Sequence, residues 1–354
     1  MELVEKPGRA AHEGLSLERL DAFLRARMEL PPEPLSVEQL PHGHSNLTYL
    51  IRCGDARWIL RRPPPGDVAS SAHDMQREHR FMAVMHGAYP LAPRSVLFCA
   101  DVEVIGAPFH VVEYRAGVVA REAAPFRELR DERVFRALCH AVVDSLARLH
   151  AVDYRAVGLS DAGRPEGYVA RQVEGWSRRW QKAATEYVPE MAELSAWLTG
   201  HVPEPLAASV VHNDFKFDNL LLDPNDLTRI VGVLDWEMST IGDPWTDVGT
   251  TLALWFEPTD PPALRAVRPG PSLWAGALSR AEVVDAYAAR SGRAPADAVP
   301  FYYCYGLFKL AVIFQQSYAR YLRGDTRDAR FAAYRDKVQA LASHAAATLA
   351  TGRI

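Results

Sequence analysis

A chain of 354 residues with 48% hydrophobic and 24% charged residues has an ordinary globular composition and is long enough for two lobes, each with its own core. The net charge of −4 offers no basic footprint for nucleic acid, and the four cysteines form no metal-type or redox pair spacing. The N-terminus lacks the apolar core of a signal peptide, and no apolar run is long enough to span a bilayer. We therefore expect a cytoplasmic protein with reduced thiols and without nucleic-acid or membrane partners.

The first predicted elements are a helix and a β-hairpin. Apolar residues at helical spacing predict a short amphipathic helix over residues 17–28, and two strands are predicted over residues 47–52 and 57–61. The small-residue segment Pro41–Asn46 could direct backbone N–H groups at phosphate, but a plain connection to the hairpin fits it equally well. Neither a complete G-x-G-x-x-G nor a G-x-x-x-x-G-K-[ST] motif occurs, which argues against a P-loop enzyme.

One strand and three helices are predicted in the next part of the chain. The helices cover residues 75–85, 134–150 and 168–185, and the strand covers residues 109–114. His150 ends the second helix, where we expect a structural histidine rather than a catalytic base. Trp176 and Trp180 lie one turn apart on the third helix and are expected to pack in the core.

The most informative segment is Val210–Glu237. It predicts a strand, a polar loop, an apolar strand, a turn and a further apolar strand that ends in an acid. The loop contains Asp214 and then Asn219, and the acid after the last strand is Asp235. An Asp and an Asn in one loop, followed by a later Asp, form the layout of a kinase catalytic loop and its metal-binding aspartate.

The chemistry of phosphoryl transfer explains these residue types. Asp214 would take the proton of the acceptor hydroxyl or orient that group. Asn219 and Asp235 would supply the oxygen ligands that Mg²⁺ prefers, and Lys216 is close enough in sequence to reach the same phosphate as a point charge. A solvated hairpin whose Asp and Asn only make turns is the alternative, and Asp223–Asp226 is a turn of that kind.

The segment resembles the aminoglycoside phosphotransferase-like (APH) family of the protein-kinase-like fold. The family has His-Gly-Asp where this chain has His212-Asn213-Asp214, and it shares the later Asn, the Asp after the strand and a Gly-Asp-Pro segment like Gly242–Pro244. Asn213 departs from the commoner Gly but can adopt the backbone angles that Gly permits. The resemblance extends over about residues 40–321.

Two further segments are most similar to one subgroup of this family. The subgroup includes kinase-like domains that are fused in some chains to acyl-CoA dehydrogenases. The similar segments are the strand Trp58–Pro64 and the residues Ala170–Gln172 together with Trp176 and Trp180. We expect no dehydrogenase in the present sequence.

The resemblance implies a nucleotide site. Gly43, Ser45 and Asn46 would belong to a phosphate-binding loop, because the family often has a Gly-x-Ser-Asn segment at this place. Glu113 and Tyr114 would mark the hinge, whose backbone groups meet the adenine. A linker at this point would put the nucleotide in the cleft between two lobes.

The resemblance also implies a cation for the nucleotide phosphates. Arg61 stands where the family places that cation, and Glu78 on the next helix would hold it. Arginine replaces the lysine of protein kinases, and its planar fork can pair with phosphate or carboxylate. Arg62 points to the opposite face of the strand and remains a competitor, and a solvated strand end is the alternative for both arginines.

The segment after Asp235 is too short for a long activation loop, which favours a small-molecule acceptor over a protein. Asp247 is expected to hold the catalytic loop, and Asp243 to cap the next helix. His212 is expected to brace the loop without acting as the base. We expect an aromatic acceptor wall of mixed charge, made of Trp255, Phe256, Tyr302, Tyr303, Tyr305, Lys309 and Gln315.

The charges near this wall bear on the acceptor. A polycationic aminoglycoside would need several acids facing the site, and only Glu257 and Asp260 lie near the wall in sequence. Antibiotic phosphorylation is therefore a property of the family rather than our expectation for this chain. A hydroxylated metabolite, including a hydroxyacyl thioester by analogy with the fused subgroup, fits at least as well.

We therefore expect an α+β, bilobal protein-kinase-like fold. A small antiparallel-sheet N-lobe would cover residues 1–115, and a larger, mainly helical C-lobe would cover residues 116–354. The expected activity is ATP-dependent transfer of the γ-phosphate to a hydroxyl of a small molecule, with Mg²⁺. A catalytically silent, kinase-shaped binding module is the alternative, and a hydrolase is disfavoured because no G-x-S-x-G motif occurs. The acceptor, the preference for ATP or GTP and the oligomeric state stay open.

Overall fold

The computed structural model describes residues 15–40, 46–63, 75–119, 129, 131–268, 270–326 and 328–354. Gly43 and Ser45 lie outside the described residues, whereas Asn46 lies within them. The chain divides into two compact units. Unit 1 comprises Met1–Val118, Leu220–Asn225 and Val231–Ser239, and unit 2 comprises Val119–Asn219, Asp226–Ile230 and Thr240–Ile354.

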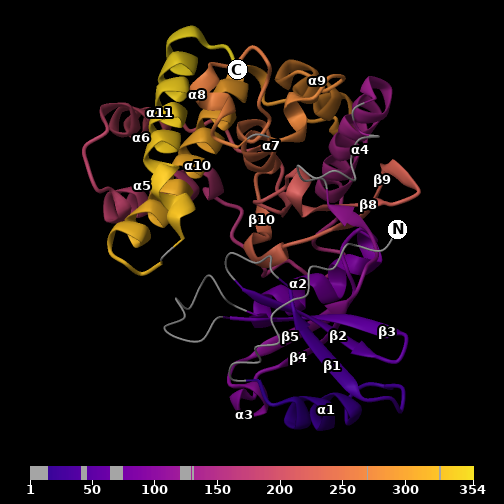
Figure 1. Ribbon diagram of the computed structural model, residues 1–354. Helices are drawn as coiled ribbons and strands as arrows, with labels where there is room; N and C mark the ends of the chain where they lie inside the picture. Colours follow the sequence, from indigo (N-terminus) through magenta and orange to yellow (C-terminus); the bar gives the residue numbers. More distant parts are fainter. Residues whose placement is uncertain are drawn as a thin grey trace. The chain divides into compact units, whose positions relative to one another are not determined.

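Unit 1 is built on a five-stranded antiparallel sheet with the strand order β1-β2-β3-β5-β4 (Figure 1). Its strands are β1 (Leu35–Gln39), β2 (Leu47–Cys53), β3 (Ala56–Arg62), β4 (Ser95–Cys99) and β5 (Phe109–Glu113). Alternate side chains of β2 and β3, such as Tyr49, Ile51 and Leu60, enter the core of the unit. In the register of β3, Arg61 lies opposite Thr48 of β2 and His110 of β5.

Helices cover parts of this sheet. They are α1 (Leu17–Arg25), α2 (Met75–Ala88) and α3 (Val102–Ile105). Ser16 caps α1, and Leu20 and Leu24 form its buried stripe. The buried residues of α2 are Met75, Glu78, Phe81, Met82 and Met85. Glu78 is the charged residue among them, and a carboxylate on a buried helix face needs a polar partner.

Unit 1 also includes the later segments Leu220–Asn225 and Val231–Ser239, whereas Asp226–Ile230 between them belongs to unit 2. A three-stranded sheet has the order β6-β8-β9, with strands β6 (Val118–Val119), β8 (Leu220–Asp223) and β9 (Asp226–Val233). The 3₁₀ turn η3 (Trp236–Met238) follows β9. Trp236 packs against Phe81 and Tyr89, with ring centroids 6.2 and 6.0 Å apart. This packing holds the segment that begins at Asp235 against α2.

Unit 2 is mainly helical. Its helices are α4 (Glu132–His150), α5 (Tyr168–Ala183), α6 (Pro189–Gly200), α7 (Pro244–Ala253), α8 (Pro262–Arg265), α9 (Arg280–Ser291), α10 (Val299–Leu322) and α11 (Tyr334–Thr351). Short 3₁₀ turns occur at η2 (Phe217–Asn219), η4 (Pro271–Leu273), η5 (Ala296–Ala298) and η6 (Ala329–Ala333). The strands β7 (Ser209–Val211) and β10 (Thr240–Gly242) pair antiparallel. No helix in the described part of the chain is both long and apolar enough to cross a membrane.

Helix α10 is the centre of unit 2 and packs against α7, α11 and α5 (Figure 1). It is buried over most of its circumference, which is typical of a helix in the interior of a large unit. Two glycines let α7 approach α10 closely. A Cβ atom on Gly249 would overlap the backbone of Tyr302, and one on Gly306 would overlap the backbone of Gly249. Backbone therefore meets backbone where these helices cross.

The predicted elements agree with the structure in type and approximate extent. The three strands expected from residue 210 onward are β7, β8 and β9. The expected polar loop connects β7 to β8, and the expected turn follows Asp223. The helix expected over residues 17–28 ends earlier, at Arg25. The α+β class is confirmed, with a sheet-based unit and a mainly helical unit.

Candidate active site

The loop between β7 and β8 brings three of the predicted residues together in unit 2. Lys216 Nζ lies 2.7 Å from Oδ1 of Asp214 and also donates to Oδ2. Asn219 Nδ2 donates to Asp214 Oδ2 at 2.8 Å and to the Asp214 main-chain carbonyl at 2.9 Å. The side chains of Asp214 and Lys216 are 22% and 21% exposed, so both are open to a reactant.

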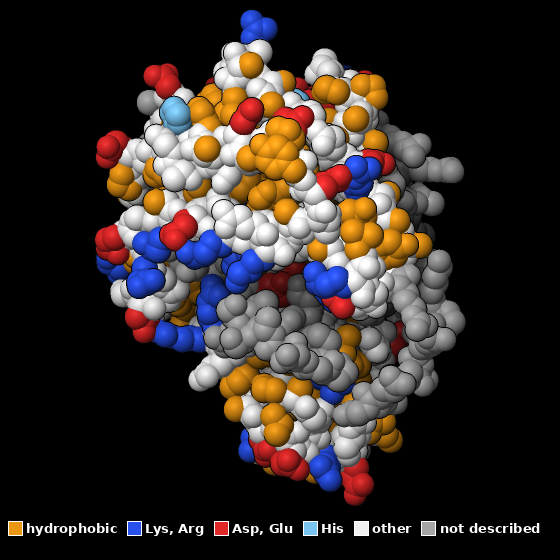
Figure 2. All heavy atoms as spheres, turned by 90° about the vertical axis from the view of Figure 1, so that its left-hand side faces the viewer, with side chains coloured by type: hydrophobic (Ala, Val, Ile, Leu, Met, Phe, Trp, Pro, Cys, Tyr) orange, Lys and Arg blue, Asp and Glu red, His pale blue; other side chains and the backbone are white. Residues whose placement is uncertain are grey.

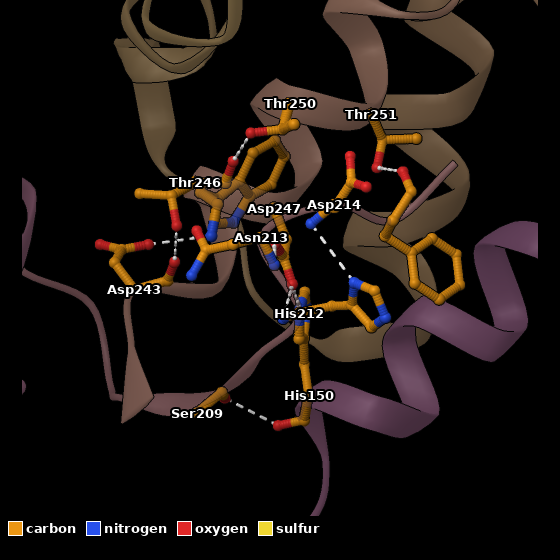
Figure 3. Close-up of polar contacts among 12 residues, drawn as sticks. His150, Ser209, His212, Asn213, Asp214, Asp243, Thr246, Asp247, Thr250 and Thr251 are labelled. Atoms are coloured by element: carbon orange, nitrogen blue, oxygen red, sulfur yellow. Dashed lines mark hydrogen bonds and ion pairs between the residues drawn. The ribbon is translucent and has the colours of Figure 1, made fainter. Parts of the chain in front are cut away.

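The backbone of this loop is held by Asp247 of α7 (Figure 3). The buried Asp247 carboxylate accepts hydrogen bonds from the backbone N–H groups of His212 and Asn213, the first at 2.6 Å. Thr251, one turn further along α7, donates to the Phe215 carbonyl at 2.9 Å. The predicted role of Asp247 is thus confirmed: it fixes the two residues before Asp214.

His150 supports Asp247 from α4. Its Nε2 lies 3.2 Å from Asp247 Oδ2, and its Nδ1 lies 2.7 Å from the hydroxyl of Tyr287. Burial alone would raise the pKa of Asp247, but the hydrogen bond and charge of His150, with the contribution of His212, lower it below its ordinary value. His150 is buried within this network, which confirms the structural role expected for it.

Asn213 holds an unusual backbone conformation that its neighbours stabilise. Its φ is 65°, in the left-handed region that the family's glycine would occupy, as expected from the tolerance of Asn for these angles. Its Nδ2 donates to the hydroxyl of Tyr168 at 3.0 Å. The buried Lys309 of α10 donates to its main-chain carbonyl. Burial lowers the pKa of Lys309 to about 8, although Asp247 and Asp214 oppose the shift.

Asp243 caps α7, as expected. Its carboxylate accepts the backbone N–H of Trp245 at 2.9 Å and the hydroxyl of Tyr302 at 2.9 Å. Pro244 follows as the first helical residue, where a missing N–H has no cost. Both aspartates of this segment therefore have structural roles in the helix that holds the loop.

A second group of charges lies in unit 1 and centres on Arg61. Its NH1 pairs with Glu78, and its NH2 lies 2.8 Å from Asp235 Oδ1 and 3.5 Å from Glu237 Oε2. Asn46 Nδ2 donates to the same Glu237 oxygen at 2.9 Å. The predicted pair of Arg61 and Glu78 is present, and the structure adds Asp235 and Glu237 to it.

Burial and charge act against each other in this group. Burial alone would lower the pKa of Arg61, but Glu78, Asp235 and Glu237 together raise it above its ordinary value. Burial raises the pKa of Glu78, Arg61 opposes the shift and Asp235 adds to it. Three carboxylates thus surround one guanidinium.

The choice between the adjacent arginines of β3 follows from the pleat of the strand. Arg62 points away from Glu78, is buried, and donates to the Ile105 carbonyl at 2.6 Å. Its guanidinium also lies 5.7 Å from the ring centroid of Tyr49. Arg61 is therefore the arginine that pairs with Glu78, Asp235 and Glu237. Its contact with phosphate stays a prediction.

Asp235 shares its backbone conformation with Asn213. Its φ is 70°, and these two are the non-glycine residues with positive φ in the described ranges. A non-glycine residue in this region costs roughly 1 kcal/mol or more and is a pointer to function. The strain therefore occurs at two positions that sequence reasoning had connected with catalysis.

Of the predicted hinge residues in unit 1, Glu113 is the last residue of β5 and Tyr114 follows it. Glu113 accepts the backbone N–H of Arg94 at 2.9 Å and Nε of Arg115 at 2.7 Å. Hydrogen bonds from Arg94 and Arg115 lower the pKa of Glu113, against a burial effect that would raise it. The guanidinium of Arg57 lies 5.7 Å from the Tyr114 ring centroid. Binding of adenine by the backbone groups at Glu113 and Tyr114 stays a prediction.

The expected acceptor wall is corrected by the structure. Trp255, Phe256, Tyr302, Tyr303, Tyr305, Lys309 and Gln315 are all buried. Several of their polar atoms bond inside unit 2: Trp255 Nε1 donates to the Leu278 carbonyl, and Gln315 Nε2 donates to the Ala183 carbonyl. These residues form the interior around α10 because buried polar atoms need partners, and they do not present an exposed wall. Trp176 and Trp180 are buried as expected.

The sequence did not predict the contacts that two residues of the site make in the structure. Glu237 joins the group around Arg61, and the only signal was its place shortly after Asp235 in Asp-Trp-Glu. Lys309 was assigned to the acceptor wall, whereas it donates to the catalytic loop from α10. A lone lysine inside an apolar helix pattern is the signal that could have indicated a buried polar contact.

Comparisons with known proteins show the family to which the chain belongs. The family model described as the phosphotransferase enzyme family (APH) matches residues 36–292. Acyl-CoA dehydrogenase family member 10 of Mus musculus is 34% identical over 298 residues, which cover 84% of this chain and 27% of that protein. Acyl-CoA dehydrogenase family member 11 of Gallus gallus is 33% identical over 319 residues, which cover 88% of this chain and 40% of that protein. The chain thus spans well under half the length of these relatives.

A solved structure extends the likeness to the fold. A crystal structure of a proposed aminoglycoside phosphotransferase from Ralstonia eutropha matches with a TM-score of 0.77 and 29% identity, covering 94% of this chain and 98% of that one. The resemblance inferred from the sequence, including its subgroup, is confirmed. The chain belongs to the phosphotransferase enzyme family, with a protein-kinase-like α+β fold of a small antiparallel-sheet lobe and a larger, mainly helical lobe.

Proposed function

We propose that this protein is an ATP-dependent phosphotransferase that moves the γ-phosphate to a hydroxyl group of a small molecule. The observation that carries the proposal is the loop around Asp214. Its carboxylate is partly exposed and contacted by Lys216 and Asn219, while Asp247 fixes the preceding backbone. A positioned carboxylate beside a cation is what in-line transfer to a hydroxyl requires.

Each residue has a distinct role in this proposal. Asp214 accepts the proton of the acceptor hydroxyl or orients that hydroxyl for attack. Lys216 balances charge on the transferring phosphate as the bond to the leaving oxygen breaks. Arg61, held by Glu78 through NH1, uses its NH2 for a nucleotide phosphate. Asn46 contributes to the phosphate-binding segment in which Gly43 and Ser45 were also predicted.

Mg²⁺ is the metal that the donor set fits. The described residues contain no cluster of three or more His, Cys, Asp or Glu side chains that could hold a metal alone. Mg²⁺ commonly uses one or two protein oxygens and takes its other ligands from phosphates and water, so such a cluster is not required. Asp235 offers a 35% exposed carboxylate, and both hydrogen bonds made by the Asn219 side chain use Nδ2, which leaves Oδ1 for a cation. Bound there, Mg²⁺ would neutralise charge on the nucleotide phosphates.

The acceptor is proposed to be a hydroxylated metabolite, and a hydroxyacyl thioester is the candidate we favour. The names of the mouse and chicken relatives refer to acyl-CoA dehydrogenases, which act on acyl thioesters. We expect a kinase domain in the same polypeptide as such an enzyme to act on the same class of substrate. Release of ADP in a panel of hydroxylated metabolites, hydroxyacyl thioesters and antibiotics would identify the acceptor.

The experiment that tests the nucleotide site is calorimetric titration of ATP with and without Mg²⁺. The wild type should bind ATP more tightly with the metal, and Asp235→Ala should lose that dependence. Asp226→Ala removes an exposed turn carboxylate and serves as the matched control, which should bind like the wild type. Absence of binding to any nucleotide by well-folded wild-type protein would contradict the proposal and favour the silent binding module.

A further inference from the structure

Helix α5 carries a row of cations on one face of unit 2. Arg171, Arg178, Arg179 and Lys182 recur at one-turn and two-turn spacing, with Gly175 between them. The last three cations and Gly175 line a hollow of about 210 Å³. Figure 2 views the molecule from the side on which Figure 1 places α5, and it shows Lys and Arg side chains gathered over one part of that face. We refer to these four cations as the α5 basic face.

The charges of the α5 basic face are poorly balanced within the protein. Arg178 pairs with Glu174, but the two side chains are 61% and 63% exposed, so this pair contributes little. Arg171 donates to two main-chain carbonyls of the preceding loop, which orients it without neutralising it. Within the part of the chain that the structure describes, neither Arg179 nor Lys182 has a carboxylate at ion-pair distance.

The α5 basic face lies beside the catalytic loop within unit 2. At the start of α5, the hydroxyl of Tyr168 accepts Nδ2 of Asn213. Two turns further on, the Trp176 ring contacts two cations, with Arg179 at 4.6 Å and Lys309 at 5.7 Å from its centroid. Lys309 in turn donates to the Asn213 carbonyl. Arg179 of the α5 basic face is therefore connected through Trp176 and Lys309 to the residue that precedes Asp214.

The length of α5 sets the size of a molecule that could use both features. A helix rises about 1.5 Å per residue, so the distance along α5 from Tyr168 to Lys182 is roughly 20 Å. An elongated small molecule can cover such a distance, with a hydroxyl at one end and charged groups at the other. Arginine forks suit phosphate groups in particular, because they donate two parallel hydrogen bonds.

We propose that the α5 basic face binds phosphate groups carried by the acceptor, at the end remote from the hydroxyl that is phosphorylated. This inference rests on the proposed phosphotransfer and narrows its acceptor to a phosphate-bearing class. A polycationic aminoglycoside would be repelled by the same surface, which disfavours such a molecule as the acceptor.

The test is calorimetric titration of three probes into protein saturated with Mg²⁺ and a non-hydrolysable ATP analogue. Coenzyme A carries a pyrophosphate and a further phosphate on a long arm, pantetheine has the arm without these phosphates, and inorganic pyrophosphate has phosphates without the arm. The variant Arg178→Gln/Arg179→Gln/Lys182→Gln removes three exposed cations of the α5 basic face. The control Arg133→Gln/Arg136→Gln/Arg290→Gln removes three exposed cations from α4 and α9.

We expect coenzyme A to bind the wild type and the control alike, and to bind the α5 variant roughly tenfold to a hundredfold more weakly. Pantetheine should bind all three proteins equally and weakly. Equal binding of coenzyme A by both variants, or no binding by wild type, would overturn the inference. Binding of pyrophosphate as tight as that of coenzyme A would also overturn it, by indicating a site for free phosphate. Titration of the ATP analogue is a separate readout, so failure of the proposed function is recognised independently.

Discussion

In the group around Arg61 in unit 1, charged side chains hold one another, whereas in the loop before Asp214 in unit 2, charged side chains hold a backbone. Arg61 is met by Glu78 and Asp235, all through side-chain atoms. In the catalytic loop, by contrast, Asp247 and Lys309 bind main-chain N–H and carbonyl groups. The first arrangement can exchange partners when a ligand brings its own charges, and the second sets a geometry before any ligand arrives.

This difference assigns separate tasks to the two groups. A network of three carboxylates around one guanidinium is suited to accept a divalent cation, because the cation can pair with a carboxylate and free the guanidinium for phosphate. A backbone held by buried groups is suited to position one reactive carboxylate, because preorganisation lowers the cost of reaching the transition state. Substitutions that affect the second group should therefore be damaging, and the following predictions measure the size of those effects.

The largest effect is expected from removal of the reactive carboxylate. Asp214→Asn should lower turnover by roughly 10²–10⁴-fold and leave nucleotide binding intact, because it changes the charge and proton affinity of one group without changing its shape. Asp218→Asn is the matched control in the same loop, since Asp218 pairs with Arg268 on the surface of unit 2. Steady-state rates with an acceptor found in the ADP-release panel are the readout. Unchanged turnover in Asp214→Asn would refute the assignment.

The next effect concerns the group that holds the loop. Asp247→Ala should reduce the free energy of unfolding by about 3–5 kcal/mol, because it leaves two backbone N–H groups and His150 without their buried acceptor. Asp131→Ala removes an exposed cap of α4 and should cost only about 1 kcal/mol. Urea denaturation of both variants measures the difference. If both variants lost a similar free energy of unfolding, the Asp247 carboxylate would contribute no more to stability than an exposed helix cap.

The smallest effect depends on pH and concerns Lys309. Its folded-state pKa of about 8 lies below the ordinary 10.5, so between these values the unfolded chain binds a proton that the folded chain lacks. The stability of the wild type should therefore rise with pH across this window, by up to about 3 kcal/mol, and the benefit should be lost as the pH falls through 8. Asp247, Asp214, Lys216 and Arg179 are the charged groups that act on Lys309.

The matched variant for this prediction is Lys309→Met, which keeps the apolar stem and removes the titrating group. The difference in unfolding free energy between wild type and Lys309→Met should increase from pH 8 to pH 10.5. Subtraction of the variant removes the contribution of every other group that titrates in this range. A difference that is constant with pH would show that the Lys309 ammonium stays charged in the folded state.

The grouping of Asp214, Lys216 and Asn219 in one loop was predictable because phosphoryl-transfer chemistry imposes both residue types and spacing, and the catalytic role of the loop stays a prediction. Asp214, Asn219 and Asp235 follow apolar strands in an order that few other functions require. The antiparallel sheet and the helix that carries Glu78 were also predictable, since strand alternation and helical spacing are local properties. Alternation could not choose between Arg61 and Arg62, because it places them on opposite faces without saying which face meets α2.

The region around α10 was assigned wrongly for a physical reason. A helix buried on all sides has apolar residues around its whole circumference, so its pattern does not reveal which polar residue faces a ligand. Lys309 and Gln315 look like pocket residues in sequence, yet both satisfy main-chain carbonyls inside unit 2. The carbonyl groups that bind these side chains belong to distant parts of the chain. A single sequence does not indicate which distant residues are in contact.

The contact between Gly249 and Gly306 has a consequence for the mutability of this protein. Asp247 lies two residues before Gly249 on α7, and Lys309 lies almost one turn after Gly306 on α10. A single methyl group at either glycine would separate the two helices whose side chains hold the backbone at Asn213. In a saturation library selected for activity, the strongest intolerance outside the loop should therefore occur at these two apolar, solvent-inaccessible positions. Engineering of a new acceptor specificity should leave that crossing untouched and vary the exposed side chains of α5.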